Sequence, residues 1–104
     1  MDKRIPPSEC RDLEDVRSGM DLIDREIVAL IAQRVDYVRA AAQFKTSSAS
    51  VAAPDRVAAV LQTRREWAES AGLDGAVIED LYRELVQYCV SEEHKRWVEI
   101  NKPY

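Results

Sequence analysis

Apolar residues recur at intervals of three and four along the first half of the chain, which is the spacing of one face of an α-helix. Asp12 suits the start of this helix as an N-cap, and Asp15 follows three residues later in a pattern close to a capping box. The pattern predicts a helix that runs to about Lys45, about 33 residues and about 50 Å long. Its stripe consists of Leu13, Val16, Met20, Ile23, Ile27, Leu30, Ile31, Arg34, Val38 and Ala41.

Two shorter helical patterns follow a polar interruption, "TSSAS", at residues 46–50. We expect a mobile loop over residues 46–53, because small polar residues break the apolar spacing there. Pro54 suits the first turn of a second helix, Gly72 its C-terminal end, and Asp74 the N-cap of a third helix. The expected inner residues of these two helices are Val57, Val60, Leu61, Arg64 or Arg65, and Trp67 or Ala68, then Ile78, Leu81, Tyr82, Leu85, Cys89, Glu92 or Glu93, Arg96, Trp97 and Ile100.

The length and composition favour a single all-α domain. The chain has 104 residues, of which 46% are hydrophobic and 33% are charged, and three are glycine. No alternating run of β-branched and aromatic residues predicts a strand. Residues 1–11 are predicted to form a flexible N-terminal segment, the lead, in which Pro6 and Pro7 prevent a helix. We therefore expect one domain over residues 1–104, built from three helices of which one is very long.

The long helix predicts an oligomer. Two shorter helices cannot cover an apolar stripe about 50 Å long, whereas a second copy of the long helix can. We therefore expect an intertwined homodimer of helical chains.

Charge and cysteine content exclude several classes of function. The net charge of −4 argues against a nucleic-acid partner, which needs a basic surface. The N-terminus, "MDKRIPPSEC", lacks an apolar signal core, and no apolar run is long enough to span a membrane. We expect a cytoplasmic protein in which Cys10 and Cys89 are reduced thiols. These cysteines and the single histidine, His94, make no zinc set, and no metal or other cofactor is expected.

Two cations interrupt the apolar stripe of the long helix. Arg34 and Lys45 lie within about 40° of one direction on the helical wheel, together with Val38 and Ala41. The Cα atoms of the two cations are about 16 Å apart along the axis, so their long side chains could converge on a compact anion. The guanidinium would bind a carboxylate through two hydrogen bonds, and the ammonium would act as a point charge.

Other charged residues could join this pair. Arg17 lies about 25 Å from Arg34 along the same helix, so it could reach a shared small ligand only from an antiparallel partner chain. Arg56, at the start of the second helix, could fold back over Lys45. The third helix offers Glu92 or Glu93 on its inner side, and the helical wheel does not choose between them.

The same charged and aromatic residues can also be explained without any catalytic or binding role. Arg34 could extend its head group to water from the edge of the stripe, and Lys45 could stabilise the end of the helix. The remaining charges could be solvated, and the aromatic residues could serve packing alone. Neither His94 nor Cys89 has an identifiable partner that would make it a base or a nucleophile.

Three segments resemble the all-helical, type II chorismate mutase family: "DLEDVRSGMDLIDREIVALIAQRVDYVRAAAQFK", "APDRVAAVL" and "GLDGAVIEDLYRELVQYCVSEEHKRW". The portion "MDLIDREIVALIAQR" is typical of the whole family. The portion "RVDYVRAAAQFK" and the short loop into "APDRV" are similar to the isochorismate pyruvate lyases, which make salicylate for siderophores. The resemblance covers nearly the whole chain. It implies a homodimer that acts on a small dicarboxylate, isochorismate or chorismate, without a cofactor.

The resemblance also implies a role for each candidate residue. Arg34 and the partner subunit's Arg17 would hold the two carboxylates of the substrate. Lys45 would contact the bridging ether oxygen and one carboxylate, and Arg56 would help to close the site beside the mobile loop. Glu93 occupies a position that is usually glutamine and faces the ether oxygen, so the catalytic set would be Lys45, Arg34 and Glu93. The substrate contacts would be Arg17, Arg34, Val38, Lys45, Arg56, Val57, Val90 and Glu93.

Two positions depart from the pattern of related enzymes. A glutamine amide donates a hydrogen bond to the ether oxygen, whereas the Glu93 carboxyl can donate only when it is protonated. This difference predicts an enzyme that favours mildly acidic conditions and gains activity at neutral pH on Glu93→Gln. Val57 stands where some mutases place a carboxylate that meets a substrate hydroxyl, which favours isochorismate over chorismate.

Three alternatives to a lyase stay open at this point. The chain could be a chorismate mutase that converts chorismate to prephenate, or a mutase that acts on an amino-substituted chorismate, since one site can serve both kinds of rearrangement. It could also be a helical dimerisation module without enzymatic activity, in which Arg34 and Lys45 are solvated charges.

Overall fold

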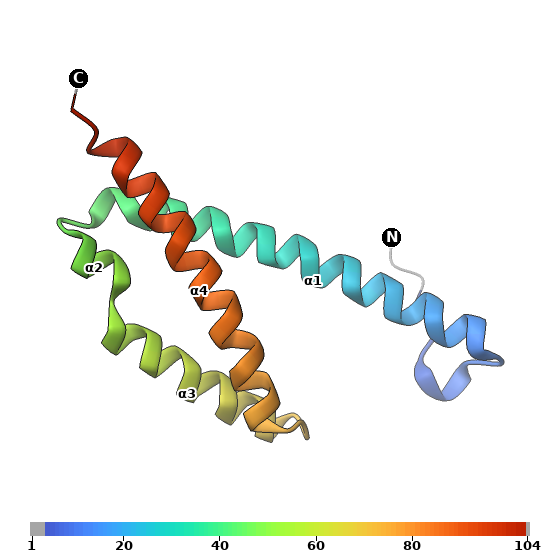
Figure 1. The fold of residues 1–104 in the computed structure, drawn as a ribbon. Helices are drawn as coiled ribbons and strands as arrows, with labels where there is room; N and C mark the ends of the chain where they lie inside the picture. Colours follow the sequence, from blue (N-terminus) through green and yellow to red (C-terminus); the bar gives the residue numbers. More distant parts are fainter. Residues whose placement is uncertain (1–3, 104) are drawn as a thin grey trace. The chain divides into compact units, whose positions relative to one another are not determined.

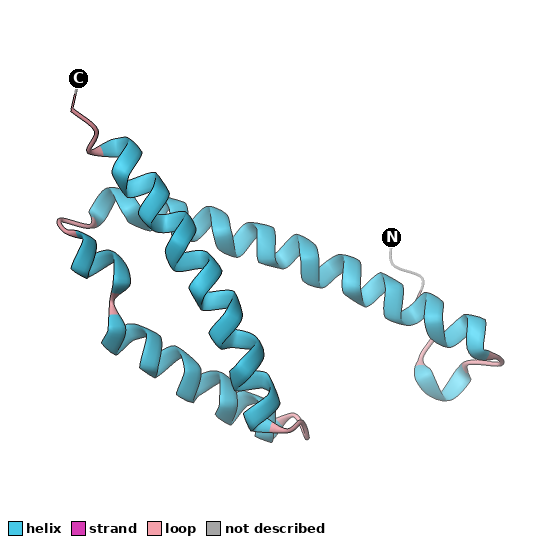
Figure 2. Ribbon diagram, viewed as in Figure 1, coloured by secondary structure: helices cyan, strands magenta, loops and turns pink. Residues whose placement is uncertain are grey.

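A computed structural model describes residues 4–103 of the chain. Their elements, in order, are the 3₁₀ turn η1 (Pro7–Glu9), the helix α1 (Leu13–Ala41), the 3₁₀ turn η2 (Ala42–Phe44), and the helices α2 (Ser48–Ala52), α3 (Pro54–Ser70) and α4 (Gly75–Ile100). Figure 1 follows these elements along the chain, and Figure 2 shows helices and loops without a strand among the described residues. The predicted all-α class is confirmed. The chain forms two compact units, which divide between Arg34 and Val35 within α1.

The start of α1 is set by two aspartates, as the sequence predicts. The Asp12 carboxylate accepts a hydrogen bond from the Asp15 main-chain N–H at 2.8 Å, which satisfies one of the donors that a helix start leaves open. The Asp15 carboxylate in turn accepts from the Arg11 N–H at 3.0 Å, and this bond lowers the pKa of Asp15. The α-helix ends at Ala41, and η2 prolongs the helical run to Phe44, one residue short of the expected end.

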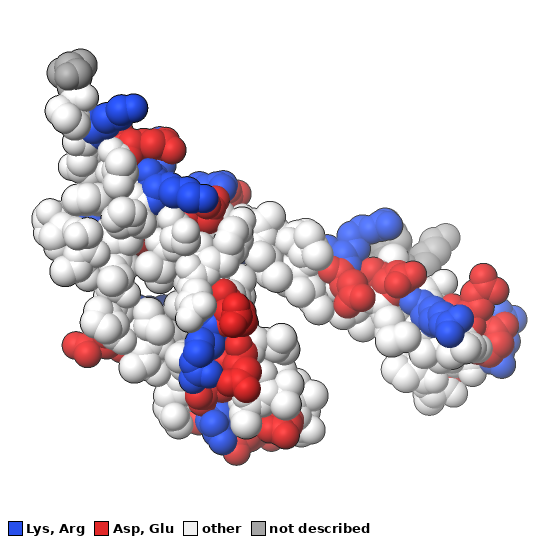
Figure 3. All heavy atoms as spheres, viewed as in Figure 1, with Lys and Arg blue, Asp and Glu red and all other residues white. Residues whose placement is uncertain are grey.

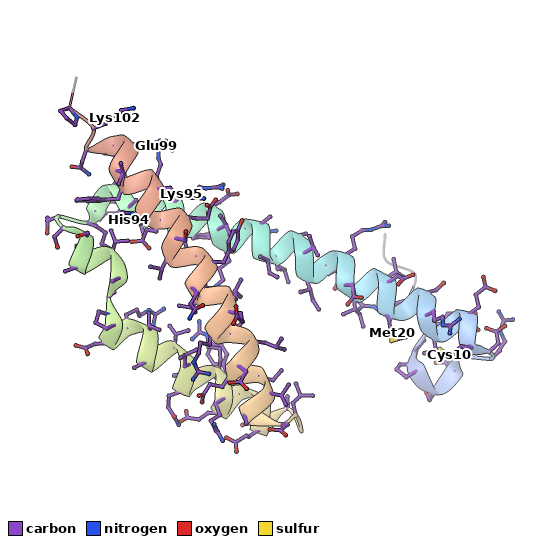
Figure 4. The ribbon with its side chains drawn as sticks, viewed as in Figure 1. Cys10, Met20, His94, Lys95, Glu99 and Lys102 are labelled. Atoms are coloured by element: carbon purple, nitrogen blue, oxygen red, sulfur yellow. The ribbon has the colours of Figure 1, made fainter. Side chains whose placement is uncertain are left out.

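The first unit leaves its apolar stripe exposed in the single chain. Ile27 is 47% exposed, and Met20 projects from α1 with 51% of its surface exposed (Figure 4). The other exposed members of the stripe in this unit are Leu13, Val16, Ile23 and Leu30. Apolar side chains at regular helical spacing without cover indicate a surface that another helix can bury.

Two segments that the sequence describes as irregular carry short helical turns, in addition to the three predicted helices, which are present as α1, α3 and α4. Most of the expected loop at 46–53 is the helix α2, which begins with a capping box: the Ser47 hydroxyl accepts from the Ser50 N–H, and the Ser50 hydroxyl accepts from the Ser47 N–H. In the expected lead, Pro7–Glu9 forms η1, because proline is tolerated in a first helical turn. Residues 1–3 of that lead lie outside the described residues.

The turn between α3 and α4 forms as the sequence predicts. Gly72 adopts a left-handed conformation, with φ of +81°, after the end of α3. The N–H of Leu73 donates to the carbonyl of Ala68 at 2.9 Å, which closes the helix end. The Asp74 carboxylate then accepts from the N–H groups of the first residues of α4 at 3.0 and 3.4 Å. The two helices therefore run back along each other as a hairpin (Figure 1).

The core of the second unit lies where α3, α2 and η2 contact α4. Its buried apolar residues are Val35, Ala42, Val51, Val60, Ala68, Val86 and Cys89. On α3 the inner residue is Ala68, while Trp67 is 61% exposed. On α4 two expected inner residues, Leu81 and Ile100, are exposed, and Val86 is buried although the predicted stripe omits it. The residues of α4 that face the core therefore differ in part from the predicted ones, because packing against α3 sets which side of α4 faces inward.

Candidate active site

The site is built around Lys45, which follows η2 with an extended backbone, φ −94° and ψ 139°. Its ammonium donates a hydrogen bond to the main-chain carbonyl of Ser50 in α2 at 2.8 Å. The same nitrogen lies 3.1 Å from Oε2 of Glu93 on α4. The Lys45 side chain is 25% exposed, so this charge is largely held within the second unit rather than in solvent.

Glu93 is the buried acidic residue of this unit, with 7% of its surface exposed. Its Oε2 atom lies at ion-pair distance from the Lys45 ammonium, but this atom has no partner with hydrogen-bond geometry. At 3.1 Å the two groups form an ion pair, because attraction between charges depends little on angle. A solvated surface role for Glu93, which the sequence left open, is therefore wrong.

Glu92 has a different role from its neighbour. It lies 2.7 Å from a guanidinium nitrogen of Arg39 in the last turns of α1 and 3.2 Å from the Lys95 ammonium. The hydrogen bond from Arg39, and then that from Lys95, hold the pKa of Glu92 below its ordinary value. The structure thus resolves the choice between the two glutamates: Glu92 pairs with exposed cations, and Glu93 faces Lys45.

Trp97 contacts the same lysine from one helical turn further along α4. Its indole N–H donates to the main-chain carbonyl of Lys45 at 3.0 Å. Sequence reasoning treated this tryptophan as a packing residue and did not consider the Ser50 carbonyl at all. The available signal was the spacing of four residues from Glu93 to Trp97, which places both on one side of a helix, together with the need of a half-buried indole N–H for a partner.

The other predicted site residues are distributed over both units. Val38, Val57 and Val90 are half-buried in the second unit, where Arg56 is exposed on the first turn of α3. Arg17, which is exposed, and Arg34, which is half-buried, belong to the first unit. Of the predicted set, the second unit brings Lys45 and Glu93 into direct contact.

A separate cleft of about 270 Å³ is lined by Arg39, Ala40, Gln43, Arg96 and Ile100. It shares no residue with the predicted site. Its two guanidinium groups are already paired, Arg39 with Glu92 and Arg96 with Glu99 at 3.2 Å. We therefore place the candidate chemistry at Lys45 and Glu93 rather than in this cleft.

Residues 4–103 hold neither a metal site nor a membrane span. This part of the chain contains no group of three or more histidine, cysteine or acidic residues arranged to hold a metal ion. None of its helices is long and apolar enough to cross a membrane. Cys10 and Cys89 are not joined in a disulfide, and Cys89 is buried. His94 and Lys95 project from α4 as exposed residues (Figure 4), and the His94 ring lies 6.1 Å from that of Trp97.

Comparison with known proteins adds independent findings. Residues 16–94 match the model of the family described as chorismate mutase type II. The chain is 43% identical over 91 residues to a protein of Pseudomonas aeruginosa named isochorismate pyruvate lyase, and the match covers 88% of this chain and 90% of that protein.

Two longer proteins match in part. The chain is 36% identical over 84 residues to the T-protein of Haemophilus influenzae and 27% identical over 86 residues to the T-protein of Enterobacter agglomerans. These matches cover 80% and 82% of this chain but 22% and 23% of the T-proteins. The shared region is therefore about the size of the chain itself.

Proposed function

The chain belongs to the chorismate mutase type II family of enzymes, and we propose that it is an isochorismate pyruvate lyase, which eliminates pyruvate from isochorismate to give salicylate. One observation carries the proposal: a largely buried ammonium, Lys45, lies beside a buried carboxyl, Glu93, at the positions where the family resemblance puts the contacts to the ether oxygen. The similarity to a protein named for this lyase activity, over most of both chains, supports the choice of reaction.

The proposed reaction is a concerted elimination. A ring hydrogen passes to the enolpyruvyl methylene group as the C–O bond breaks, so that the ring becomes salicylate and the side chain leaves as pyruvate. No base and no nucleophile takes part in this step. The protein supplies a folded substrate conformation, which brings the reacting atoms together, and a fixed positive charge where the ether oxygen gains electron density.

Each polar residue has one task in this mechanism. Lys45 donates to the ether oxygen as its charge develops, and its ammonium needs no protonation step to do so. Arg34 and the partner subunit's Arg17 hold the two carboxylates of the substrate through paired hydrogen bonds. Arg56 covers the bound anion from the start of α3. The apolar side chains that contact the ring are Val38, Val57 and Val90.

The dimer is part of the proposal because Arg17 acts across it. Support comes from the apolar stripe of α1, of which six residues in the first unit, Leu13, Val16, Met20, Ile23, Ile27 and Leu30, are between 39% and 60% exposed in the single chain. A second copy of α1 presents the same stripe and would bury it by two-fold symmetry. We further propose that the salicylate serves siderophore production, as the family resemblance implies.

A direct assay tests the proposed function. The purified protein is incubated with isochorismate, with chorismate and with an amino-substituted chorismate, and salicylate fluorescence and prephenate formation are followed. We expect salicylate and pyruvate from isochorismate in equal amounts. Turnover of none of the three would contradict an enzymatic role and favour a dimerisation module, which also predicts no thermal stabilisation by salicylate with pyruvate.

Chorismate mutase activity is the second candidate, and the family match favours it. The same assay distinguishes the two, because prephenate forms without release of pyruvate. Prephenate from chorismate with no salicylate from isochorismate would replace the lyase by the mutase. Both products, with salicylate formed faster, would agree with a lyase that retains some mutase activity.

A further inference from the structure

We propose that Trp97 is a positioning residue for Lys45: its indole N–H holds the main chain of the lysine so that the ammonium stays beside Glu93 and the Ser50 carbonyl. This inference deepens the proposed function, because it assigns the group that places the charge facing the ether oxygen. It concerns an atom that does not touch the substrate, and Trp97 acts through Lys45 alone.

The first step of the argument is the open carbonyl of Lys45. The Lys45 N–H closes η2 by donating to the Ala42 carbonyl at 3.2 Å. The chain then turns into an extended conformation, so the Lys45 carbonyl lies past the last turn of the helix and lacks a helical partner. The Trp97 indole N–H supplies that partner at 3.0 Å.

The second step is the spacing along α4. Glu93 and Trp97 are four residues apart, so they lie on one side of the helix about 6 Å apart along its axis. Glu93 contacts the ammonium of Lys45, and Trp97 contacts its carbonyl. One face of a rigid helix therefore holds both ends of the same residue.

The third step is the flexibility of lysine. Four rotatable bonds separate the ammonium from the main chain, so the ion pair and the hydrogen bond of the ammonium do not define where it lies unless the main chain is also fixed. The third contact, from the ammonium to the Ser50 carbonyl, extends the same arrangement to α2 at 2.8 Å. Loss of the indole bond would release the main chain of Lys45 and loosen all three contacts together.

The test removes the N–H and keeps the ring. In the full-length protein, Trp97 is replaced by 3-benzothienylalanine, in which sulfur takes the place of the indole N–H, and in a second variant by phenylalanine, Trp97→Phe. We expect kcat for isochorismate to fall about tenfold in the first variant while KM stays within about twofold, because substrate carboxylates are held by other residues. The matched control places 3-benzothienylalanine at Trp67, which is 61% exposed and stacks on Arg64 instead of bonding to Lys45.

A double-substitution cycle separates positioning from general structure. In a Lys45→Ala background the Trp97 N–H has no ammonium to position, so its replacement should then leave kcat unchanged. The same tenfold loss in that background would overturn the proposal, since Trp97 would then act on the fold as a whole.

A second measurement does not depend on activity. Brief acetylation with acetic anhydride, followed by mass spectrometry, reports how readily each lysine nitrogen is reached and released from its partners, because only an amine that has lost its proton reacts. Without the indole N–H we expect Lys45 to be acetylated several-fold faster, with Lys95, whose side chain is 71% exposed, as the internal reference. Unchanged Lys45 labelling would overturn the proposal. A wild-type protein without turnover would contradict the proposed function, and the labelling would still decide whether Trp97 holds Lys45.

Discussion

The Lys45 ammonium has two partners of different kinds: it forms an ion pair with the Glu93 carboxylate and donates a hydrogen bond to the main-chain carbonyl of Ser50. Both keep the positive charge directed into the second unit while three-quarters of the side chain is shielded from solvent. A cation that is already in place needs little reorganisation when charge develops on a substrate oxygen, and this is the property that lowers a reaction barrier. The neighbouring lysine on α4, Lys95, is exposed and pairs with Glu92 instead.

Lys45→Ala should lower kcat much more than it weakens binding. Loss of one preorganised donor typically costs about 3 kcal/mol in the barrier, which is roughly a 150-fold slower reaction. Steady-state kinetics with isochorismate measure the effect, and circular dichroism checks that the variant folds. Lys95→Ala is the control and should turn over normally. Equal turnover in Lys45→Ala would refute the role of this residue.

Glu93→Gln should raise activity at neutral pH by about an order of magnitude. The amide can donate a hydrogen bond to the ether oxygen, whereas a carboxylate cannot. Steady-state kinetics with isochorismate at pH 7 measure the effect. Glu92→Gln, which alters the glutamate paired with Arg39, should leave turnover as it is. A Glu93→Gln variant that is no faster than the wild type would count against this role.

At the scale of elements, α3 and α4 are joined by a network of charged residues. Glu79 of α4 lies 3.1 Å from Arg65 of α3 and 2.8 Å from Arg83 of its own helix. Figure 3 shows acidic and basic side chains interleaved over this hairpin. The hydrogen bond from Arg65, and then that from Arg83, lower the pKa of Glu79 from its ordinary value near 4.5. The charged form of this glutamate is therefore favoured in the folded hairpin.

Glu79→Gln should lower the melting temperature at pH 7 by at most a few degrees, because exposed ion pairs contribute little. A carboxyl whose pKa is lowered by folding contributes its full stability above about pH 4.5 and loses it as the pH falls through the folded value. The difference between variant and wild type should thus shrink as the pH is lowered into the acidic range. Thermal unfolding over a series of pH values measures it, with Glu84→Gln on the same helix as control. A difference that stays the same as the pH falls would show that the charge is not its cause.

At the scale of the whole molecule, the second unit has its own core, whereas the apolar stripe of the first unit is exposed in the single chain. Burial of such a stripe by a second copy would remove several large apolar side chains from water. The proposed dimer and the proposed site depend on each other, because in this proposal the partner subunit's Arg17 binds one carboxylate of the substrate. Loss of the dimer should therefore remove activity without any change at Lys45.

Ile27→Lys should weaken the dimer by about a hundredfold or more, since it places a charge within an apolar contact. Sedimentation at a series of concentrations measures the association, and activity should fall on dilution in parallel with it. Ala29→Lys is the matched control, because that position faces about 160° away on the helical wheel. A wild-type chain that sediments as a monomer at all concentrations would contradict the dimer.

Much of the fold follows from residues that act on their immediate neighbours. Asp12, Gly72 and Asp74 mark helix ends through hydrogen bonds or backbone conformations that involve residues at most a few positions away. Pro54 begins α3 for the same kind of reason. The sequence also singled out Lys45 within the apolar stripe, and it reduced the acidic partner to Glu92 or Glu93. What it missed was α2, whose serines read as loop residues although they form a capping box.

By itself, then, the sequence determined the helical class, the limits of the long helices and the candidate charges, because spacing and capping are local properties of a chain. The tertiary structure decided that Glu93 rather than Glu92 faces Lys45, that Ala68 rather than Trp67 faces inward, and that Trp97 reaches the Lys45 carbonyl. Adjacent helical positions differ by about 100°, so either of two neighbours can face inward until another helix packs against them. Only that packing, between residues some fifty positions apart, sets which side chain meets the charge.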